Sequence, residues 1–231
     1  MHILQPISFI DSIADRLHLA PVVIGTWIVM ALLIVFGLIA RRAVEAADPM
    51  TPDDGITVRS TGEVLIEWFT GFFDEVAGHD ARNLMPFFAS LFVFVLAANF
   101  FGLIPGMEPP TSDTDLTFAL GAICFVFYLY CGFAAHGIGY LKVFLGPVPF
   151  LIPLMLFIEI ADNLFRPFSL GIRLYANMFA DHTVLGIATG LTYLAVPVLL
   201  YALGSIVCIV QALVFTILAM TYVRMAQGEA H

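Results

Sequence analysis

Five long apolar stretches constrain the fold of this chain more than any other feature. The first three, Val22–Ala40, Leu84–Ile104 and Leu116–Ala135, each hold about 20 residues, the length that an α-helix needs to cross the hydrocarbon core of a bilayer. Two longer stretches follow, Leu154–Thr189 and Leu194–Ala226. The sequence therefore predicts an all-α integral membrane protein with five membrane helices.

The composition supports this interpretation. Charged residues make up 12% of the chain and hydrophobic residues 61%, whereas a soluble domain carries about 25% charged residues. We expect a single membrane domain over residues 1–231, with residues 22–40 as the first span and residues 84–226 as channel-forming helices. The sequence shows no phosphate-binding loop or metal-ligand spacing, so we expect no cofactor, no metal and no nucleic acid partner.

Basic residues indicate how the chain crosses the membrane. Seven of the nine Lys and Arg residues lie before, between or at the ends of the apolar stretches, and the other two, Arg166 and Arg173, lie inside the fourth. Six of these seven share one side of the membrane if the N-terminal segment, residues 1–21, lies outside. The positive-inside rule then places residues 43–83 and the C-terminus in the cytoplasm.

One segment of the cytoplasmic region has an amphipathic pattern. Within Glu63–Val76, apolar residues recur at helical spacing beside acidic ones; they are Leu65, Trp68, Phe69, Phe72, Phe73 and Val76. Such a helix suits the membrane interface, and it equally suits a contact with a partner subunit. The expected fold is therefore five membrane helices plus one interfacial amphipathic helix.

The fourth apolar stretch is too long to cross a bilayer upright. As one helix its 36 residues would span about 54 Å, nearly twice the hydrocarbon thickness. We therefore expect the helix to tilt or kink, with Pro167 as a kink site. Gly190-Leu191-Thr192 predicts a turn, so the last two helices should form a long oblique hairpin.

Polar side chains form a stripe along this fourth stretch. At about 100° per residue they share an arc of about 120°; the residues are Glu159, Asp162, Asn163, Arg166, Ser169, Arg173, Asn177 and Asp181. His182 lies on the opposite side. Because a charge at the bilayer centre costs at least about 2.5 kcal/mol, the stripe must face water, protein or both.

The two arginines of the stripe differ in their surroundings. Asp162 stands one turn before Arg166, which predicts an internal ion pair. Arg173 has only Ser169 and Asn177 at one turn. Since an arginine stays charged at physiological pH, a buried Arg173 requires a carboxylate from elsewhere.

One polar residue of the last helix matches Arg173 in depth. If the turn is centred near Thr192, Gln211 and Arg173 are level. An isolated membrane glutamine either forms an interhelical hydrogen bond or takes part in function, and both interpretations stay open.

Two segments and one residue resemble a known family. Pro167-Phe-Ser-Leu-Gly-Ile-Arg173-Leu-Tyr-Ala-Asn177-Met is similar to the region around the essential arginine in subunit a of the rotary F-type ATP synthase. Asn99-Phe-Phe-Gly-Leu-Ile-Pro105-Gly, followed by Pro109-Pro-Thr-Ser, is a second match, and Gln211 is a third. The resemblance runs in order from about Gly62 to the C-terminus.

The resemblance implies a stator subunit of a bacterial inner membrane, pressed against a rotating ring of c subunits. Its other partners would be b-type peripheral stalk subunits and the remaining ATP synthase subunits, which carry the ATP chemistry. Protons would reach and leave the ring through two half-channels. Arg173 would keep the passing ring carboxylate ionised and prevent leakage, Asn177 and Gln211 would position it, and Glu159 would serve the cytoplasmic half-channel.

The sequence departs from the family pattern at one pair of positions. Many bacterial members carry a Glu at the position of His182 and a His at the position of Gly204. The missing acid could come from Asp181 or Asp162, so these two join Glu159 and His182 as half-channel candidates. His182 is either a proton relay or a structural histidine.

Two other functions fit the sequence less well. A secondary transporter could bind an anionic substrate at Arg173, but such folds usually contain inverted repeats with interrupted helices, and the Arg173 region has no second copy here. A purely structural membrane anchor would leave Arg173 unexplained.

Overall fold

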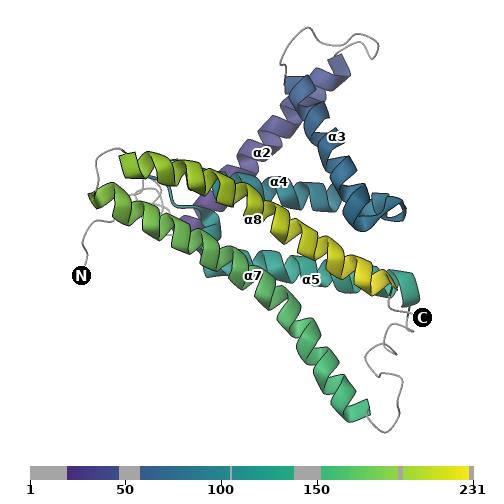
Figure 1. Ribbon diagram of the computed structural model, residues 1–231. Helices are drawn as coiled ribbons and strands as arrows, with labels where there is room; N and C mark the ends of the chain where they lie inside the picture. Colours follow the sequence, from purple (N-terminus) through teal and green to yellow (C-terminus); the bar gives the residue numbers. More distant parts are fainter. Residues whose placement is uncertain (1–19, 47–57, 105, 138–151, 192–194, 229–231) are drawn as a thin grey trace.

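The computed structural model describes residues 20–46, 58–104, 106–137, 152–191 and 195–228, and most of these residues lie in helices (Figure 1). The α-helices in chain order are α2 (Pro21–Ala46), α3 (Val58–Ala77), α4 (Met85–Phe101), α5 (Thr114–His136), α7 (Ile152–Leu191) and α8 (Ala195–Gly228). Two 3₁₀ helices, η1 (His79–Leu84) and η2 (Pro110–Ser112), precede α4 and α5. The expected all-α class is confirmed over the described residues.

Four of the described helices are long and apolar enough to cross a membrane. The candidate spans are Pro21–Arg42, Arg82–Phe101, Thr114–His136 and Val198–Gly228. Helix α7 has 40 residues, about 60 Å, but the charges of its polar stripe lower its hydropathy. Four predicted spans are thus confirmed by length and composition, and the fifth remains a prediction.

Local sequence signals explain where α4 and α5 begin and end. The Asp113 carboxylate caps α5 by accepting a hydrogen bond of 2.8 Å from the Asp115 N–H. Helix α5 ends at Gly137, whose φ of 57° suits glycine. Helix α4 ends three residues before the predicted Ile104, and a Cβ added to Gly102 at this end would lie 2.4 Å from the Pro109 side chain. Close packing of the returning chain therefore accompanies the end of α4.

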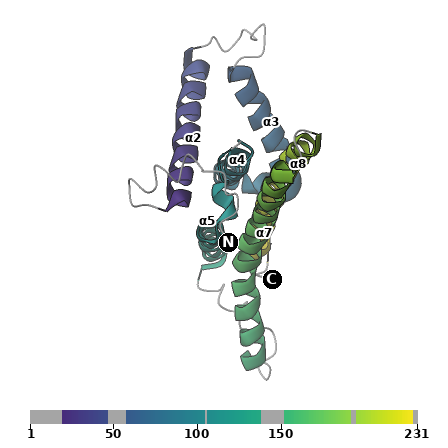
Figure 2. The same cartoon turned by 90° about the vertical axis from the view of Figure 1, so that its left-hand side faces the viewer.

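Helices α7 and α8 form one layer that packs against α4 and α5. In Figure 2, α4 and α5 are seen nearly end on, with α7 and α8 together on one side of them. The shared core draws on all four helices, and its most enclosed residues include Phe88, Val95, Tyr128, Leu170, Leu174, Cys208, Ala212 and Met220. Cys124, Cys131 and Cys208 are all buried and form no disulfide bond, as expected of packing residues.

The apolar face of α3 packs on its own chain. Phe69 and Phe73 are buried, and their rings lie 5.6 Å from Phe92 and 6.0 Å from Phe88 of α4. From α8, the Arg224 guanidinium donates a hydrogen bond of 2.7 Å to the Val76 carbonyl. Intramolecular packing thus occupies much of the face for which the pattern suggested a membrane or partner contact. An interfacial position for α3 remains a prediction.

The predicted hairpin is formed by α7 and α8. Asp181 lies against Gly204 near one end of the pair, and Arg166 lies over the Tyr222 ring farther along. These contacts establish an antiparallel pairing. The α7 ribbon changes direction partway along its length (Figure 1), and Pro167 lies inside this helix. The turn was predicted two residues too early, because Gly190 and Leu191 still belong to α7. Thr192, the last residue of that prediction, and residues 1–19 of the N-terminal segment lie outside the described residues.

Candidate functional site

The polar stripe of α7 lies at the boundary between packed and uncovered surface. Buried residues, above all Leu170, Leu174 and Met178, fix the rotation of the helix. This rotation turns Asn163 into the core and leaves Ser169 and Arg173 exposed on the outer edge. The stripe therefore faces both its own chain and an uncovered surface, one of the arrangements expected from the cost of burying charge in a membrane.

Arg173 makes no hydrogen bond or ion pair with any residue that the structure describes. Its side chain is exposed, and Ala176 and Ala180, three and seven residues later on the same side of α7, are exposed too. The guanidinium thus stands on a largely apolar outer face. Nothing in the described chain neutralises its charge, so a partner molecule is the natural source of a counter-ion.

The helix register places Gln211 near the level of Arg173. Asp181 lies against Gly204 across the antiparallel pair. Arg173 precedes Asp181 by eight residues, so its counterpart on α8 is eight residues after Gly204, at Ala212, which is next to Gln211. Counting from the Arg166–Tyr222 contact instead gives position 215, about one turn away. Gln211 and Asn177 are both half-buried. The depth match inferred from the sequence is therefore consistent with the observed pairing.

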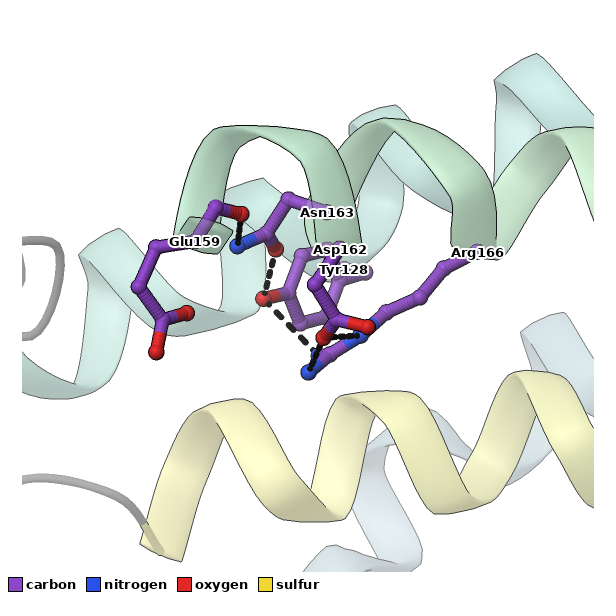
Figure 3. A network of polar contacts seen from close by, with 5 residues as sticks. All are labelled: Tyr128, Glu159, Asp162, Asn163 and Arg166. Atoms are coloured by element: carbon purple, nitrogen blue, oxygen red, sulfur yellow. Dashed lines mark hydrogen bonds and ion pairs between the residues drawn. The ribbon is translucent and has the colours of Figure 1, made fainter. Parts of the chain in front are cut away.

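Arg166 occupies a separate network on the inner side of α7, toward α5 and α8 (Figure 3). Its guanidinium pairs with the Asp162 carboxylate at 2.7 Å, as the spacing predicted, and donates a weaker hydrogen bond of 3.3 Å to the Tyr128 hydroxyl. The same hydroxyl donates to the Asn163 side-chain oxygen at 2.6 Å. Arg166 also lies 5.6 Å from the ring centres of both Tyr128 and Tyr222. It thereby joins α5, α7 and α8.

The two acidic residues near Arg166 differ in the interactions of their carboxylates. The Asp162 carboxylate is committed to Arg166. Figure 3 shows the Glu159 carboxylate pointing away from the network, and it forms no ion pair or hydrogen bond with a described side chain. Only the Glu159 backbone carbonyl takes part, accepting from the Asn163 amide at 2.9 Å. Of these two acids, Glu159 is therefore the one whose carboxylate is not held by a described side chain.

A hydroxyl deletion tests the network. Tyr128→Phe leaves the buried Asn163 side-chain oxygen without its hydrogen-bond donor, and we expect the free energy of unfolding to fall by about 1 kcal/mol. For a chain of this size that lowers the midpoint of thermal unfolding by about 2–4 °C, measured on the detergent-solubilised protein. Tyr130→Phe is the matched control, because Tyr130 is on the same helix and 66% exposed. Equal midpoints for the two variants would contradict the role given to the Tyr128 hydroxyl.

A second acid lies toward the turn between α7 and α8. A Cβ built on Gly204 would lie 2.8 Å from Asp181 Oδ2, so the half-buried Asp181 carboxylate sits against the bare backbone of α8. His182 is also half-buried and is electrostatically coupled to Asp181. Both lie on the opposite side of Arg173 from Glu159 along α7.

Sequence reasoning missed a buried polar bridge beside this acid. The Asn99 side chain donates to the Cys208 carbonyl at 3.4 Å and accepts a hydrogen bond of 2.7 Å from the Thr111 hydroxyl. It ties η2 and α8 to α4, and both Asn99 and Thr111 are almost fully buried. The sequence signal for this bridge was an asparagine within an apolar stretch, because a buried side-chain amide requires hydrogen-bond partners.

Fold and site together define a class: a helical membrane protein that keeps charged side chains within its membrane-length helices. Among the described residues no group of three or more His, Cys, Asp or Glu could hold a metal ion. Charges in such helices are typical of proteins that move ions or polar solutes.

Comparison with known proteins narrows this class. The model of the ATP synthase A chain family matches residues 23–224. ATP synthase subunit a of Bdellovibrio bacteriovorus is 45% identical over 181 residues, covering 78% of this chain and 79% of the relative. The subunits a of Trichlorobacter lovleyi and Geobacter sulfurreducens are 37% and 35% identical, over 98% and 100% of this chain and 99% and 100% of theirs. The chain belongs to the ATP synthase subunit a family.

Proposed function

We propose that this chain is the stator subunit of the membrane sector of a rotary ATP synthase, and that it conducts protons to and from a ring of c subunits. Relatives that match nearly the whole chain are named ATP synthase subunit a. Other subunits, including the b-type peripheral stalk, would complete the complex and carry the ATP chemistry. The orientation inferred from the basic residues, with the N-terminus outside a bacterial inner membrane, is part of the proposal.

The observation that carries the proposal is the Arg173 guanidinium, which is exposed on α7 and forms no ion pair or hydrogen bond with any residue that the structure describes. A permanent charge in a membrane requires a counter-ion, since the unpaired state costs at least about 2.5 kcal/mol. Each passing c subunit would present one carboxylate to this face. Asn177 and Gln211, half-buried near the same level, would orient that carboxylate.

Acids on both sides of Arg173 suit two half-channels. Glu159 lies 14 residues before Arg173 and Asp181 eight residues after it, about 21 Å and about 12 Å along a straight helix. Glu159 would serve the cytoplasmic half-channel, and the acid near the turn would serve the outer one. Asp162 is less suited to carry protons, because Arg166 holds it.

Proton transfer follows from the charge of Arg173. A ring carboxylate in apolar surroundings favours its protonated form, and a nearby cation favours the ionised form. The ring site would therefore lose its proton as it approaches Arg173 and regain one after leaving. A potential of 100 mV supplies about 2.3 kcal/mol per proton, so each ATP requires several protons.

Cysteine cross-linking tests which face meets the ring. Ser169→Cys sits on the outer edge beside Arg173, and we expect it to cross-link with a cysteine placed next to the ring carboxylate in the assembled complex. Phe168→Cys is the control at the same depth, because Phe168 turns toward Phe118 of α5, with ring centres 5.1 Å apart. Stronger cross-linking from position 168 than from position 169 would contradict the proposed orientation.

A further inference from the structure

Arg166 is a largely buried cation that contacts of three helices hold in place. Its side chain is 12% exposed, and one Asp162 carboxylate oxygen on the same helix accepts hydrogen bonds of 2.7 Å and 3.1 Å from it. The guanidinium lies 5.6 Å from the ring centres of Tyr128 on α5 and Tyr222 on α8. Because these contacts come from α5, α7 and α8, the guanidinium cannot shift without disturbing at least one of them.

A chain of hydrogen bonds connects this cation to the backbone of Glu159 (Figure 3). The Tyr128 hydroxyl accepts a hydrogen bond of 3.3 Å from Arg166 and donates one of 2.6 Å to the Asn163 side-chain oxygen. The Asn163 side-chain amide then donates to the Glu159 carbonyl at 2.9 Å. Arginine can only donate and a hydroxyl has one hydrogen, so Arg166 directs that hydrogen toward Asn163. The cation therefore fixes the direction of the whole hydrogen-bond chain.

These contacts lie just before Pro167, inside a helix whose ribbon changes direction partway along its length (Figure 1). Proline has no N–H, so α7 loses the hydrogen bond that residue 167 would donate to the carbonyl of residue 163. The segment that carries Glu159 is therefore held less firmly by the helix itself. Its direction depends more on side-chain contacts with α5 and α8, and Arg166 makes such contacts with both helices.

Packing alone does not account for a charge at this place. Apolar residues of similar volume usually stabilise a protein as well as a buried ion pair does, or better. Such residues would fill the space beside the rings of Tyr128 and Tyr222, but they could not direct the Tyr128 hydroxyl toward Asn163. What the guanidinium adds is the hydrogen-bond chain, and that chain ends at Glu159.

We infer that Arg166 is a positioning residue, which acts through Tyr128 and Asn163 to hold Glu159 in the orientation that serves proton exchange with the cytoplasmic side. Arg166 does not carry protons itself, because a guanidinium stays charged at physiological pH. Asp162 is held in the ion pair with Arg166 and leaves this exchange to Glu159. The inference rests on the proposed function, in which Glu159 serves the cytoplasmic half-channel.

Proton-driven ATP synthesis by membrane vesicles, normalised to the amount of assembled complex, tests this role. We expect Arg166→Gln to lower the rate by about fivefold or more, the change in population that follows the loss of one hydrogen bond, and Arg166→Lys to retain more activity. The dependence of the rate on cytoplasmic pH should also shift in Arg166→Gln, which a loss of stability alone would not cause. Arg82→Gln is the control, because Arg82 forms an ion pair of similar length, 2.6 Å, outside the network. A normal rate and pH dependence in Arg166→Gln would overturn the inference.

Tyr128→Phe tests the hydrogen-bond chain by itself, and it decides the question if the Arg166 variants do not assemble. It removes the hydroxyl but keeps the ring beside the guanidinium, and we expect the rate per assembled complex to fall by about fivefold. Tyr130→Phe, on the same helix and 66% exposed, should keep the normal rate. Equal rates for the two variants would show that the chain does not position Glu159.

Cysteine labelling measures the orientation of the side chain at position 159 directly. In complexes that carry Glu159→Cys, a membrane-impermeant thiol reagent is added on the cytoplasmic side of the vesicles; the native cysteines are buried and should react slowly. Adding Tyr128→Phe should change the labelling rate severalfold, whereas adding Tyr130→Phe should leave it unchanged. An unaltered labelling rate with Tyr128→Phe would contradict the inference. If Arg173→Ala is inactive while the Arg166 and Tyr128 variants behave normally, only this assignment fails and the proposed function stands.

Discussion

Replacing Arg173 with alanine is expected to abolish proton-driven ATP synthesis, with a loss of more than a hundredfold, while the complex still assembles. Assembly should survive because Arg173 is exposed and contacts no described partner by hydrogen bond or ion pair. Its removal should change the free energy of unfolding by no more than about 0.5 kcal/mol. Function should be lost because nothing else on the outer face of α7 would keep a ring carboxylate ionised as it passes.

The measurement is ATP synthesis by membrane vesicles under an imposed proton gradient and potential, normalised to the amount of assembled complex. Arg82→Ala is the matched control: Arg82 pairs with Asp74 at 2.6 Å, its side chain is 56% exposed, and it lies in η1, just before α4. We expect that variant to keep the normal rate, since exposed ion pairs contribute about 0–1 kcal/mol. Synthesis at the normal rate by Arg173→Ala would refute the proposed mechanism.

Arg173→Lys separates charge from geometry. Lysine keeps a positive charge but has no planar, bidentate donor set, and its pKa falls readily in a desolvated site. We therefore expect proton-driven ATP synthesis to remain severely impaired in this variant.

The sequence was sufficient to predict the features of α7 that depend on spacing along one helix. The Asp162–Arg166 ion pair follows from a separation of one turn, and the structure confirms it. The absence of an acid one turn from Arg173 indicated an unpaired guanidinium, and no intramolecular partner is found among the described residues. Such inferences succeed because helix geometry fixes which neighbours on the same helix can meet.

Contacts between helices were harder to predict, and α8 shows why. In a membrane helix the side that faces lipid is as apolar as the side that faces protein. Exposed Leu203 and Ile206 therefore look no different in sequence from buried Phe215 and Met220. Without a polar face the rotation of α8 could not be assigned, so the contact of Gly204 with Asp181 was not foreseen.

Tyr128 illustrates the same limit for single residues. In the sequence it is one aromatic residue within the apolar stretch that becomes α5. Its role as a donor to Asn163 and an acceptor from Arg166 depends on the approach of α5 to α7. For α3 the pattern correctly predicted an apolar face, but not that much of this face would be covered by Phe88 and Phe92 of α4.

The approach of α5 to α7 gives the second large expected effect. A Cβ on Gly121 would lie 2.7 Å from the Pro167 carbonyl oxygen, and one on Gly171 would lie 3.0 Å from the Thr117 carbonyl oxygen. These obstacles are backbone atoms, which cannot rotate away as a side chain can. Glycines thus allow the two helices to pack backbone to backbone, as small residues do in membrane proteins.

We expect Gly121→Val to separate α5 from α7 and to prevent stable accumulation of the protein, because overpacking costs about 1–3 kcal/mol even where side chains can adjust. Displacing α5 would also move Tyr128 away from Arg166 and weaken the network that orients the Glu159 end of α7. The amount of chain in membranes and its thermal midpoint in detergent are the measurements. Gly71→Val on α3 is the control, because a Cβ there would meet nothing within 4 Å. Comparable amounts and midpoints for the two variants would show that the helices can move apart at little cost, and that the close approach does not position the site.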